Sequence, residues 1–191
     1  MEGCLITFIG PSGVGKSVIL NRLIERYPEL INRSISTTTR KKRPNEDDSD
    51  FYFKTKKEFL EMINNGEFLE YNDYVGNYYG TSFESILPFL DEGKNVFKVI
   101  EVNGLKSIKD SARMNSRKHI SIFINTPSRG ERENRIRNRG KLSEEEIIAR
   151  LKTGDEELKF YYANERYFNH YIINDDLDSA LEQILNIIRG I

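Results

Sequence analysis

The chain has 191 residues but a single cysteine, Cys4, so no disulfide framework can form within it. Because Cys4 lies inside an apolar run, we expect it to pack as a small hydrophobic side chain rather than to react. Histidine is almost as scarce, and neither His119 nor His170 has partners at metal-ligand spacing. We therefore expect both histidines to be structural.

An excess of charge of one sign is also missing. The chain has 29 Lys and Arg against 30 Asp and Glu, a net charge of -1, although 31% of its residues are charged. No overall field favours nucleic acid or a membrane surface, so we expect neither as a partner, and any anion site must be built locally. The amino terminus has no long apolar segment and no Arg- and Ser-rich leader, which favours a cytoplasmic protein.

The most informative segment that is present spans residues 10–17 and reads G-x-x-x-x-G-K-S. It follows the apolar run 4–9 and precedes a helical pattern, which is the setting of a phosphate-binding loop. The loop consists of Gly10, Pro11, Ser12, Gly13, Val14, Gly15, Lys16 and Ser17. Its glycines let backbone N–H groups converge on phosphate, Lys16 can reach the terminal phosphates, and Ser17 can bind magnesium. The alternative is a glycine-rich connection without a ligand, but the full pattern in this setting favours a nucleoside triphosphate site.

Apolar runs alternate with helical patterns along much of the chain, which predicts an α/β fold with a mostly parallel sheet covered on both faces. We expect strands at 4–9, 95–101, 119–125 and 171–174, and helices at 17–26, 104–112, 128–139, 143–167 and 177–189. The length suits one domain. Within it we expect a core (1–33, 83–126 and 153–191), an insert (34–82) and an arginine-rich lid (127–152).

The insert begins with a polar, basic loop at 34–44. Arg40 and Arg43 could clamp one phosphate with their forked guanidinium groups, although a solvated basic loop is an equal alternative from this segment alone. The insert also predicts short strands at 51–53 and 67–71, with a helix between them that begins at a capping box at Thr55. Carboxylates, aromatic rings and hydroxyls in segments 67–71 and 76–82 favour a second substrate site.

Several ordered motifs together resemble those of the guanylate kinases along the whole chain. The matching segments are the phosphate loop, S-x-S-x-T-T-R-x-x-R-P at 34–44, E-F-L-E at 67–70, G-N-Y-Y-G-T at 76–81, P-S-x6-R-x3-R-G at 127–140 and N-D-D-L at 174–177. The resemblance implies a P-loop NTPase-type fold and an enzyme that transfers a phosphoryl group from ATP to GMP with Mg²⁺.

The resemblance also implies where each substrate lies. ATP would occupy residues 10–17, with Asn174 near its adenine, and GMP would occupy the insert. Arg40 and Arg43 would hold the GMP phosphate with Tyr79, while Glu70 would accept from guanine N1–H and the exocyclic amine. Ser36 and Thr81 would donate to the O6/N7 edge, and Glu101 would reach the guanine amine or Arg40. Because adenine has an acceptor at N1 where guanine has a donor, guanine preference depends mainly on Glu70.

For catalysis, the resemblance implies that positive groups surround the transferring phosphoryl group. These are Lys16, Arg43, Arg135, Arg139 and Arg150, with the magnesium ion held by Ser17. The other lid arginines, Arg129, Arg132 and Arg137, are expected on a solvated helix face.

The sequence departs from the family pattern at three places. Val99 stands where guanylate kinases usually have a carboxylate, and Phe51 stands where a phosphate-binding tyrosine is expected. Pro88 falls inside an expected helix at 82–92, where proline breaks a helix unless it lies in the first turn.

These departures leave two alternatives open, a weak or inactive interaction module and a P-loop kinase for another small phosphate ester. Lys16, Ser17 and the lid arginines favour an enzyme over a module, and Glu70 with Ser36 and Thr81 favours guanine. The sequence does not separate GMP from dGMP, or a monomer from a homodimer.

Overall fold

The computed structural model describes residues 3–42, 46, 51–74, 76–138, 140 and 142–191. Its larger sheet has five strands in the order β2-β7-β1-β8-β9, and every pairing between neighbours is parallel. The strands are β1 (Cys4–Ile9), β2 (Asn32–Arg33), β7 (Val96–Val99), β8 (Lys118–Asn125) and β9 (His170–Ile173). The predicted α/β class with a parallel central sheet is confirmed.

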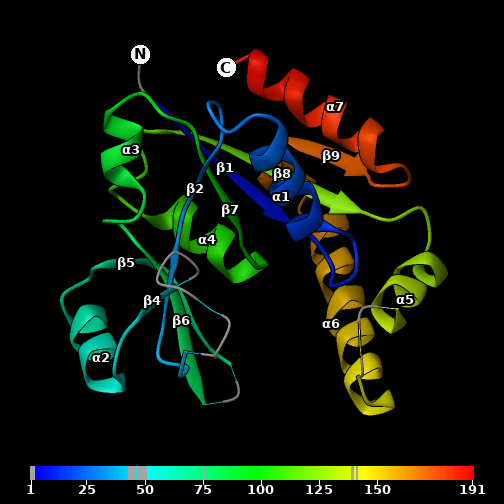
Figure 1. Cartoon of the computed structure of the whole chain (residues 1–191), viewed down its shortest axis with the longest axis horizontal. Helices are drawn as coiled ribbons and strands as arrows, with labels where there is room; N and C mark the ends of the chain where they lie inside the picture. The colour runs from blue at the N-terminus through cyan, green and yellow to red at the C-terminus, as the bar shows by residue number, and fades with distance from the viewer. Residues whose placement is uncertain (1–2, 43–45, 47–50, 75, 139, 141) are drawn as a thin grey trace.

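Both faces of this sheet are covered because side chains of β1 alternate between two hydrophobic clusters. Cys4, Ile6 and Phe8 join the cluster that contains α1 (Lys16–Arg26) and α7 (Leu177–Arg189). Leu5 and Ile9 join the cluster that contains α3 (Leu87–Asp91), α4 (Val102–Asp110) and part of α6 (Glu144–Ala163). Two helical layers therefore enclose the strands, and they leave the strand ends free to build a site (Figure 1).

The insert forms a second, four-stranded sheet in the order β4-β3-β6-β5. Its elements are β3 (Ser36–Thr38), β4 (Phe51–Phe53), α2 (Lys56–Asn64), β5 (Phe68–Tyr74) and β6 (Asn77–Ser82). The predicted capping box is present: the Thr55 side chain accepts from the backbone of Glu58, and the Glu58 carboxylate accepts from the backbone of Thr55. Phe59 packs this helix onto the sheet by stacking on Phe68, with ring centroids 4.3 Å apart.

The lid segment contributes α5 (Arg129–Arg137) and the first turns of α6. Ser128 caps α5, and Ser143 with Glu146 forms a capping box at the start of α6. A small apolar cluster of Ile136, Ile147 and Leu151 joins the two helices. In Figure 1 the pair lies across the molecule from the insert.

Several boundaries differ from those predicted. The helix expected at 82–92 is only α3, and it starts at Leu87, so Pro88 lies in its first turn, where proline is tolerated. The helix expected to reach residue 167 ends at Ala163, and a separate 3-10 turn spans Glu165–Tyr167. Strands β2, β3 and β6 were not predicted. None of the described helices is long and apolar enough to cross a membrane.

Phe123→Ala should lower the free energy of unfolding by about 3–5 kcal/mol, because it opens a cavity in the centre of one core. Phe123 is fully buried, and its ring centroid lies 4.5 Å from that of Tyr161 and 5.2 Å from that of Phe168. Urea unfolding measures the change. Phe89→Ala is the control, because Phe89 is 37% exposed, and it should cost about 1 kcal/mol or less. Equal losses for the two variants would contradict this account of the core.

Candidate functional site

The segment 10–17 connects β1 to α1 and contains two glycines that no other residue could replace without strain. Gly10 has φ +139°, and a Cβ atom there would lie 2.1 Å from the carbonyl oxygen of Ile124 on β8. Gly13 has φ +89°, and its Cβ would lie 2.9 Å from the carbonyl oxygen of Arg132 on α5. Both the backbone conformation and the close packing therefore require glycine.

Two further contacts hold the same loop from other directions. On α6, a Cβ atom at Gly154 would lie 3.0 Å from Cβ of Pro11, so helix and loop are in close contact. After β9, the buried Asn174 donates its amide to the carbonyl oxygen of Val14, at 2.8 Å. The structure thus brings Asn174 to the loop as a support, and its predicted contact with adenine stays a prediction.

Lys16 and Glu157 give the loop region its local electrostatics. The Lys16 ammonium donates to the carbonyl oxygens of Gly10 and Pro11. Burial raises the pKa of the Glu157 carboxyl on α6 to about 7, although the positive charges of Lys16 and Arg132 oppose that rise. Sequence reasoning did not identify Glu157, because nothing in the helical pattern of 144–163 shows that its side chain faces Lys16.

The insert brings the predicted base-binding residues into one row. Glu70 on β5 pairs with Thr81 on β6, and the register of β3 with β6 continues to place Ser36 opposite Thr81. The Thr81 hydroxyl donates to the Glu70 carboxylate. Burial raises the pKa of Glu70, while the Thr81 hydrogen bond and the charge of Lys98 oppose this rise. Three polar groups of the kinds predicted therefore lie side by side.

Arg40 lies two residues beyond the end of β3 and forms a bidentate pair with Glu46, with nitrogen–oxygen distances of 2.7 and 2.8 Å. Its guanidinium carbon lies 5.3 Å from the centre of the Phe51 ring. Hydrogen bonds to Glu46 raise the pKa of Arg40, with a smaller contribution from Tyr79. Phe51 lacks the hydroxyl expected at its position, but it forms an aromatic support beneath the arginine. Arg43 and Arg139 lie outside the described residues.

The lid presents Arg135 toward the segment that follows β9. Its guanidinium donates to the carbonyl oxygen of Asn174 at 2.9 Å, and its Nε donates to Glu131 at 2.7 Å. Arg150 is half-buried on α6, next to Leu151 of the cluster that joins the two lid helices. Glu101 is exposed and accepts a hydrogen bond from Asn72. The guanine contact predicted for Glu101 stays a prediction.

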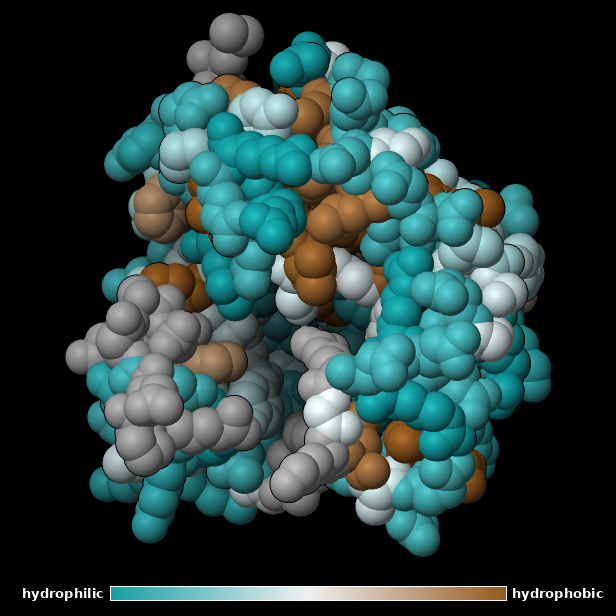
Figure 2. Space-filling view, turned by 45° about the vertical axis from the view of Figure 1, so that its right-hand side comes forward, coloured by the Kyte–Doolittle hydropathy of each residue, from teal (hydrophilic) through white to brown (hydrophobic). Residues whose placement is uncertain are grey.

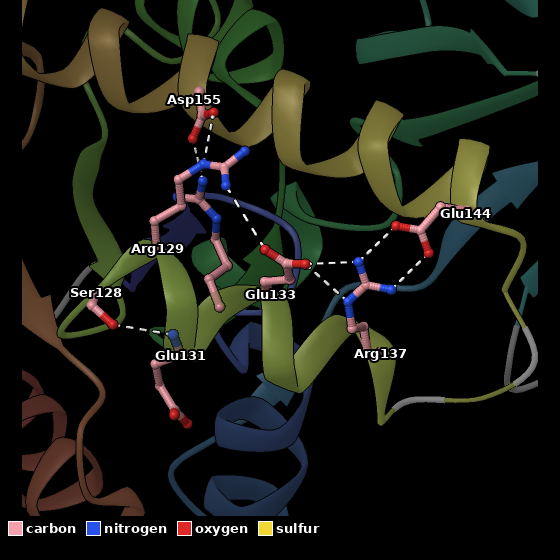
Figure 3. A network of polar contacts seen from close by, with 8 residues as sticks. Ser128, Arg129, Glu131, Glu133, Arg137, Glu144 and Asp155 are labelled. Atoms are coloured by element: carbon pink, nitrogen blue, oxygen red, sulfur yellow. Dashed lines mark hydrogen bonds and ion pairs between the residues drawn. The ribbon is translucent and has the colours of Figure 1, made fainter.

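Arg129, Arg132 and Arg137 were expected on a solvated helix face, and the structure agrees for Arg129 and Arg137. Arg137 pairs with Glu133 and Glu144, and Arg129 lies between Glu133 and Asp155, all near the surface (Figure 3). The expectation was wrong for Arg132, which is 1% exposed and forms an ion pair with Asp155. Arg132 lies inward because α5 packs directly against the loop at Gly13.

A small cavity of about 90 Å³ connects the two predicted substrate regions. Ser17 of the loop and Ser36 of the insert both line it, together with Val99 and the buried Lys98. Lys98 was not identified from the sequence, although a lysine within the apolar run 96–100 is a signal that could have found it. The face seen in Figure 2 is mostly hydrophilic and is hollowed near its centre, as suits charged ligands.

The oxygen atoms near Ser17 suit a cation that is held mainly by substrate phosphates and water. Ser17 is exposed at the start of α1, so its hydroxyl can serve as one oxygen ligand. Among the described residues, no group of three or more His, Cys, Asp and Glu side chains could hold a metal ion. This arrangement fits Mg²⁺, which keeps several waters and takes oxygen ligands from substrate phosphates.

Comparisons with known proteins agree on one family. The profile of the family described as guanylate kinase matches residues 3–190. A protein named guanylate kinase from Lactococcus lactis is 40% identical over 190 residues, which cover 99% of this chain and 88% of that protein. One from Nostoc sp. is 44% identical over 185 residues, with coverage of 96% and 88%. The crystal structure of guanylate kinase from Anaplasma phagocytophilum has a TM-score of 0.73 and 29% identity, and the match covers 99% of this chain and 86% of that one.

Glu157→Gln should make the protein more stable at neutral and alkaline pH. The folded-state pKa of about 7 lies above the ordinary 4.5, so the stability that protonated Glu157 contributes is present below pH 4.5 and is lost as pH rises through 7. Glutamine does not ionise. The variant should therefore exceed the wild type in free energy of unfolding by about 1–3 kcal/mol at about pH 8, and by less at about pH 5.

Urea unfolding at both pH values tests this expectation. Glu156→Gln, at an exposed position on the same helix, is the control and should leave the pH dependence of stability unchanged. A Glu157→Gln effect of the same size at both pH values would show that ionisation of this carboxyl is not the cause.

Proposed function

The chain belongs to the guanylate kinase family, and from this premise we propose how its own residues hold the two substrates of the reaction. The reaction is the transfer of a phosphoryl group from ATP to GMP, giving ADP and GDP. The observation that carries the proposal is the cavity that has Ser17 of the phosphate loop on one side and Ser36 of the insert on the other. Phe51, over whose ring Arg40 lies, also lines this cavity, so a GMP phosphate held at Arg40 would face the ATP phosphates at Ser17.

ATP binds along residues 10–17. The positive φ angles at Gly10 and Gly13 support this assignment, because such a backbone lets N–H groups converge on an anion. Lys16 exchanges its loop carbonyl partners for phosphate oxygens. Ser17 would hold Mg²⁺ together with the phosphates, and the ion would supply charge neutralisation at the transferring group.

The guanine base of GMP binds at the row formed by Ser36, Thr81 and Glu70. The Glu70 carboxylate has one oxygen engaged by Thr81, and its remaining lone pairs accept from guanine N1–H and the exocyclic amine. Ser36 donates to the O6/N7 edge, and Thr81 donates there only when its single hydroxyl hydrogen leaves Glu70. Glu101, directly before α4, is a further residue that contacts guanine. None of these residues contacts the ribose, where GMP and dGMP differ, so both nucleotides are proposed substrates.

The GMP phosphate binds at Arg40, with help from Tyr79 and Arg43. Arg40 already binds a carboxylate in the fork geometry that phosphate requires, and it is held over the Phe51 ring. Binding GMP then replaces Glu46 by a phosphate of greater charge.

The lid completes the site around the transferring phosphoryl group. Arg135 lies next to Asn174, which itself supports the phosphate loop, so a modest change in its partners brings it to the terminal phosphate. Arg139 and Arg150 act with it. Their positive charges offset the repulsion between two polyphosphates, and closure excludes water that would otherwise hydrolyse ATP. We assign the roles of core, insert and lid to residues 1–33, 83–126 and 153–191, to 34–82 and to 127–152 respectively.

The two alternative functions have less support. An interaction module has no need of Lys16, Ser17 and Arg135, all of which the chain retains. A kinase for another phosphate ester has no need of Glu70 beside Thr81. The proposed enzyme is a monomer or a homodimer.

An ADP-release assay with GMP, AMP, CMP and UMP tests the function, and Glu70→Gln tests the base site. The wild type should use GMP far better than the other three. In Glu70→Gln, kcat/KM for GMP should fall about 10- to 100-fold, because a charge-assisted hydrogen bond contributes about 1.5–3 kcal/mol. The KM for ATP should stay unchanged.

Glu67→Gln is the matched control, since Glu67 lies on the same insert and contacts Asn65 instead of the row. It should leave both substrates unaffected. The base-site proposal fails if Glu70→Gln weakens ATP and GMP equally, and the function fails if the wild type prefers another acceptor or uses none.

Arg135→Met should reduce kcat by roughly two to four orders of magnitude, as expected for a group that neutralises transition-state charge. Arg137→Met is the control on the same helix, because Arg137 pairs with Glu133 and Glu144 near the surface. It should change kcat less than threefold. Single-turnover measurement separates the phosphoryl transfer step from product release, and similar losses in both variants would argue against a specific role for Arg135.

A further inference from the structure

Lys98 is a buried charge inside the central sheet. Its side chain extends from β7 and is only 7% exposed. Among the described residues, Lys98 and Arg132 are the only buried side chains that carry a full charge. Arg132 has an ion-pair partner in Asp155, whereas Lys98 has none within that part of the chain. A buried ammonium of this kind is expensive unless something accepts its hydrogen bonds.

The hydrogen bonds of Lys98 are only partly used. An ammonium has three N–H donors and no acceptor. Within the described residues, its one hydrogen-bond acceptor is Ser36 Oγ. Burial lowers the pKa of Lys98 to about 8, with Glu70 opposing the shift and Arg33 adding to it, so the group is mostly charged at neutral pH. Two N–H donors are therefore left for a ligand that supplies acceptors.

The bond to Ser36 also fixes the direction of the serine hydroxyl. Because the ammonium can only donate, Ser36 Oγ accepts from it, and the Ser36 hydrogen is free to donate elsewhere. Ser36 belongs to the row with Thr81 and Glu70, and it lines the same cavity as Lys98. Donors thus gather at the Ser36 end of the row, and the Glu70 carboxylate provides acceptors at the other end.

Guanine has the complementary arrangement. Its O6 and N7 atoms are two adjacent acceptors on one edge, a pattern that lysine and arginine recognise in protein–DNA contacts. Adenine has an amino group in place of O6 and would direct donors at Lys98.

We propose that Lys98 is a guanine-specificity residue, whose ammonium, together with the Ser36 hydroxyl that it orients, donates to the O6/N7 edge of the bound base. This inference rests on the proposed GMP site and adds a positive partner opposite Glu70. The base would then be recognised by charge on both edges, which gives a role to the lysine in the otherwise apolar strand β7.

The test compares Lys98→Met with the wild type on GMP and on two analogues that each weaken one acceptor, 6-thio-GMP at O6 and 7-deaza-GMP at N7. The wild type should lose at least tenfold in kcat/KM on one analogue or both. Lys98→Met should lose about tenfold or more on GMP itself, through KM, and should no longer discriminate against the same analogue. Its kcat and its KM for ATP should change less than threefold.

Lys118→Met is the matched control, since Lys118 is an exposed lysine at the start of β8 in the same sheet, and it should behave as the wild type. The melting temperature of Lys98→Met should be unchanged or raised, because replacing a buried charge by an apolar side chain is often neutral or stabilising. If Lys98→Met does not fold, Lys98→Gln provides the same comparison, with a neutral donor that should restore part of the discrimination.

Two results overturn the inference alone: undiminished discrimination against both analogues in the Lys98 variants, or a wild type that discriminates against neither. Failure of the underlying GMP site is distinct, because it appears as a wild type without guanine preference or as Glu70→Gln without effect on base selection.

Discussion

Close packing of the phosphate loop against four other elements is the constraint on which the site depends. Gly10 lies against the backbone of β8, and Gly13 lies against α5. Gly154 of α6 contacts Pro11, and Asn174 after β9 binds Val14. A loop that is fixed from several sides presents its N–H groups without the cost of ordering them on binding. The same contacts join α5, at Gly13, and the middle of α6, at Pro11, to this loop.

This packing explains why charged groups are buried around the loop. Arg132 lies where α5 meets Gly13, and it is retained there through Asp155, although breaking such a pair is far more costly than its net stabilisation. Glu157 has no such ion pair within the described residues, and burial raises its pKa to about 7 although the charges of Lys16 and Arg132 oppose the rise. The buried Glu157 carboxylate therefore lowers the stability of the folded chain near Lys16 at neutral pH. Such costs are common where charged groups are positioned for binding.

Much of this could be predicted from the sequence, because the information was local. The alternation of apolar runs predicted the parallel sheet, and Thr55 and Ser143 marked two helix starts through capping boxes. Strands β3 and β6 were missed because they are polar and are defined by pairing with β4, with β5 and with each other, which no local pattern shows. The burial of Arg132, the coupling of Glu157 to Lys16 and the bond from Lys98 to Ser36 were also missed. Each joins residues more than twenty positions apart, so no local pattern contains them.

The ion pair between Arg40 and Glu46 affects the desolvation cost of binding an anion at Arg40. The side chains are 14% and 16% exposed, so both charges are already largely removed from water. A guanidinium without a partner in that setting would lose its solvation without compensation. In the proposed site, a phosphate that replaced Glu46 would exchange one bidentate acceptor for another, so the desolvation of Arg40 would not be a further cost of binding. The exchange favours an anion only if it carries more charge than a carboxylate, which a phosphate monoester does at neutral pH. In the proposed site, selection for a phosphate at Arg40 and selection for a base at Glu70 would thus depend on separate interactions, one beyond the end of β3 and one on β5.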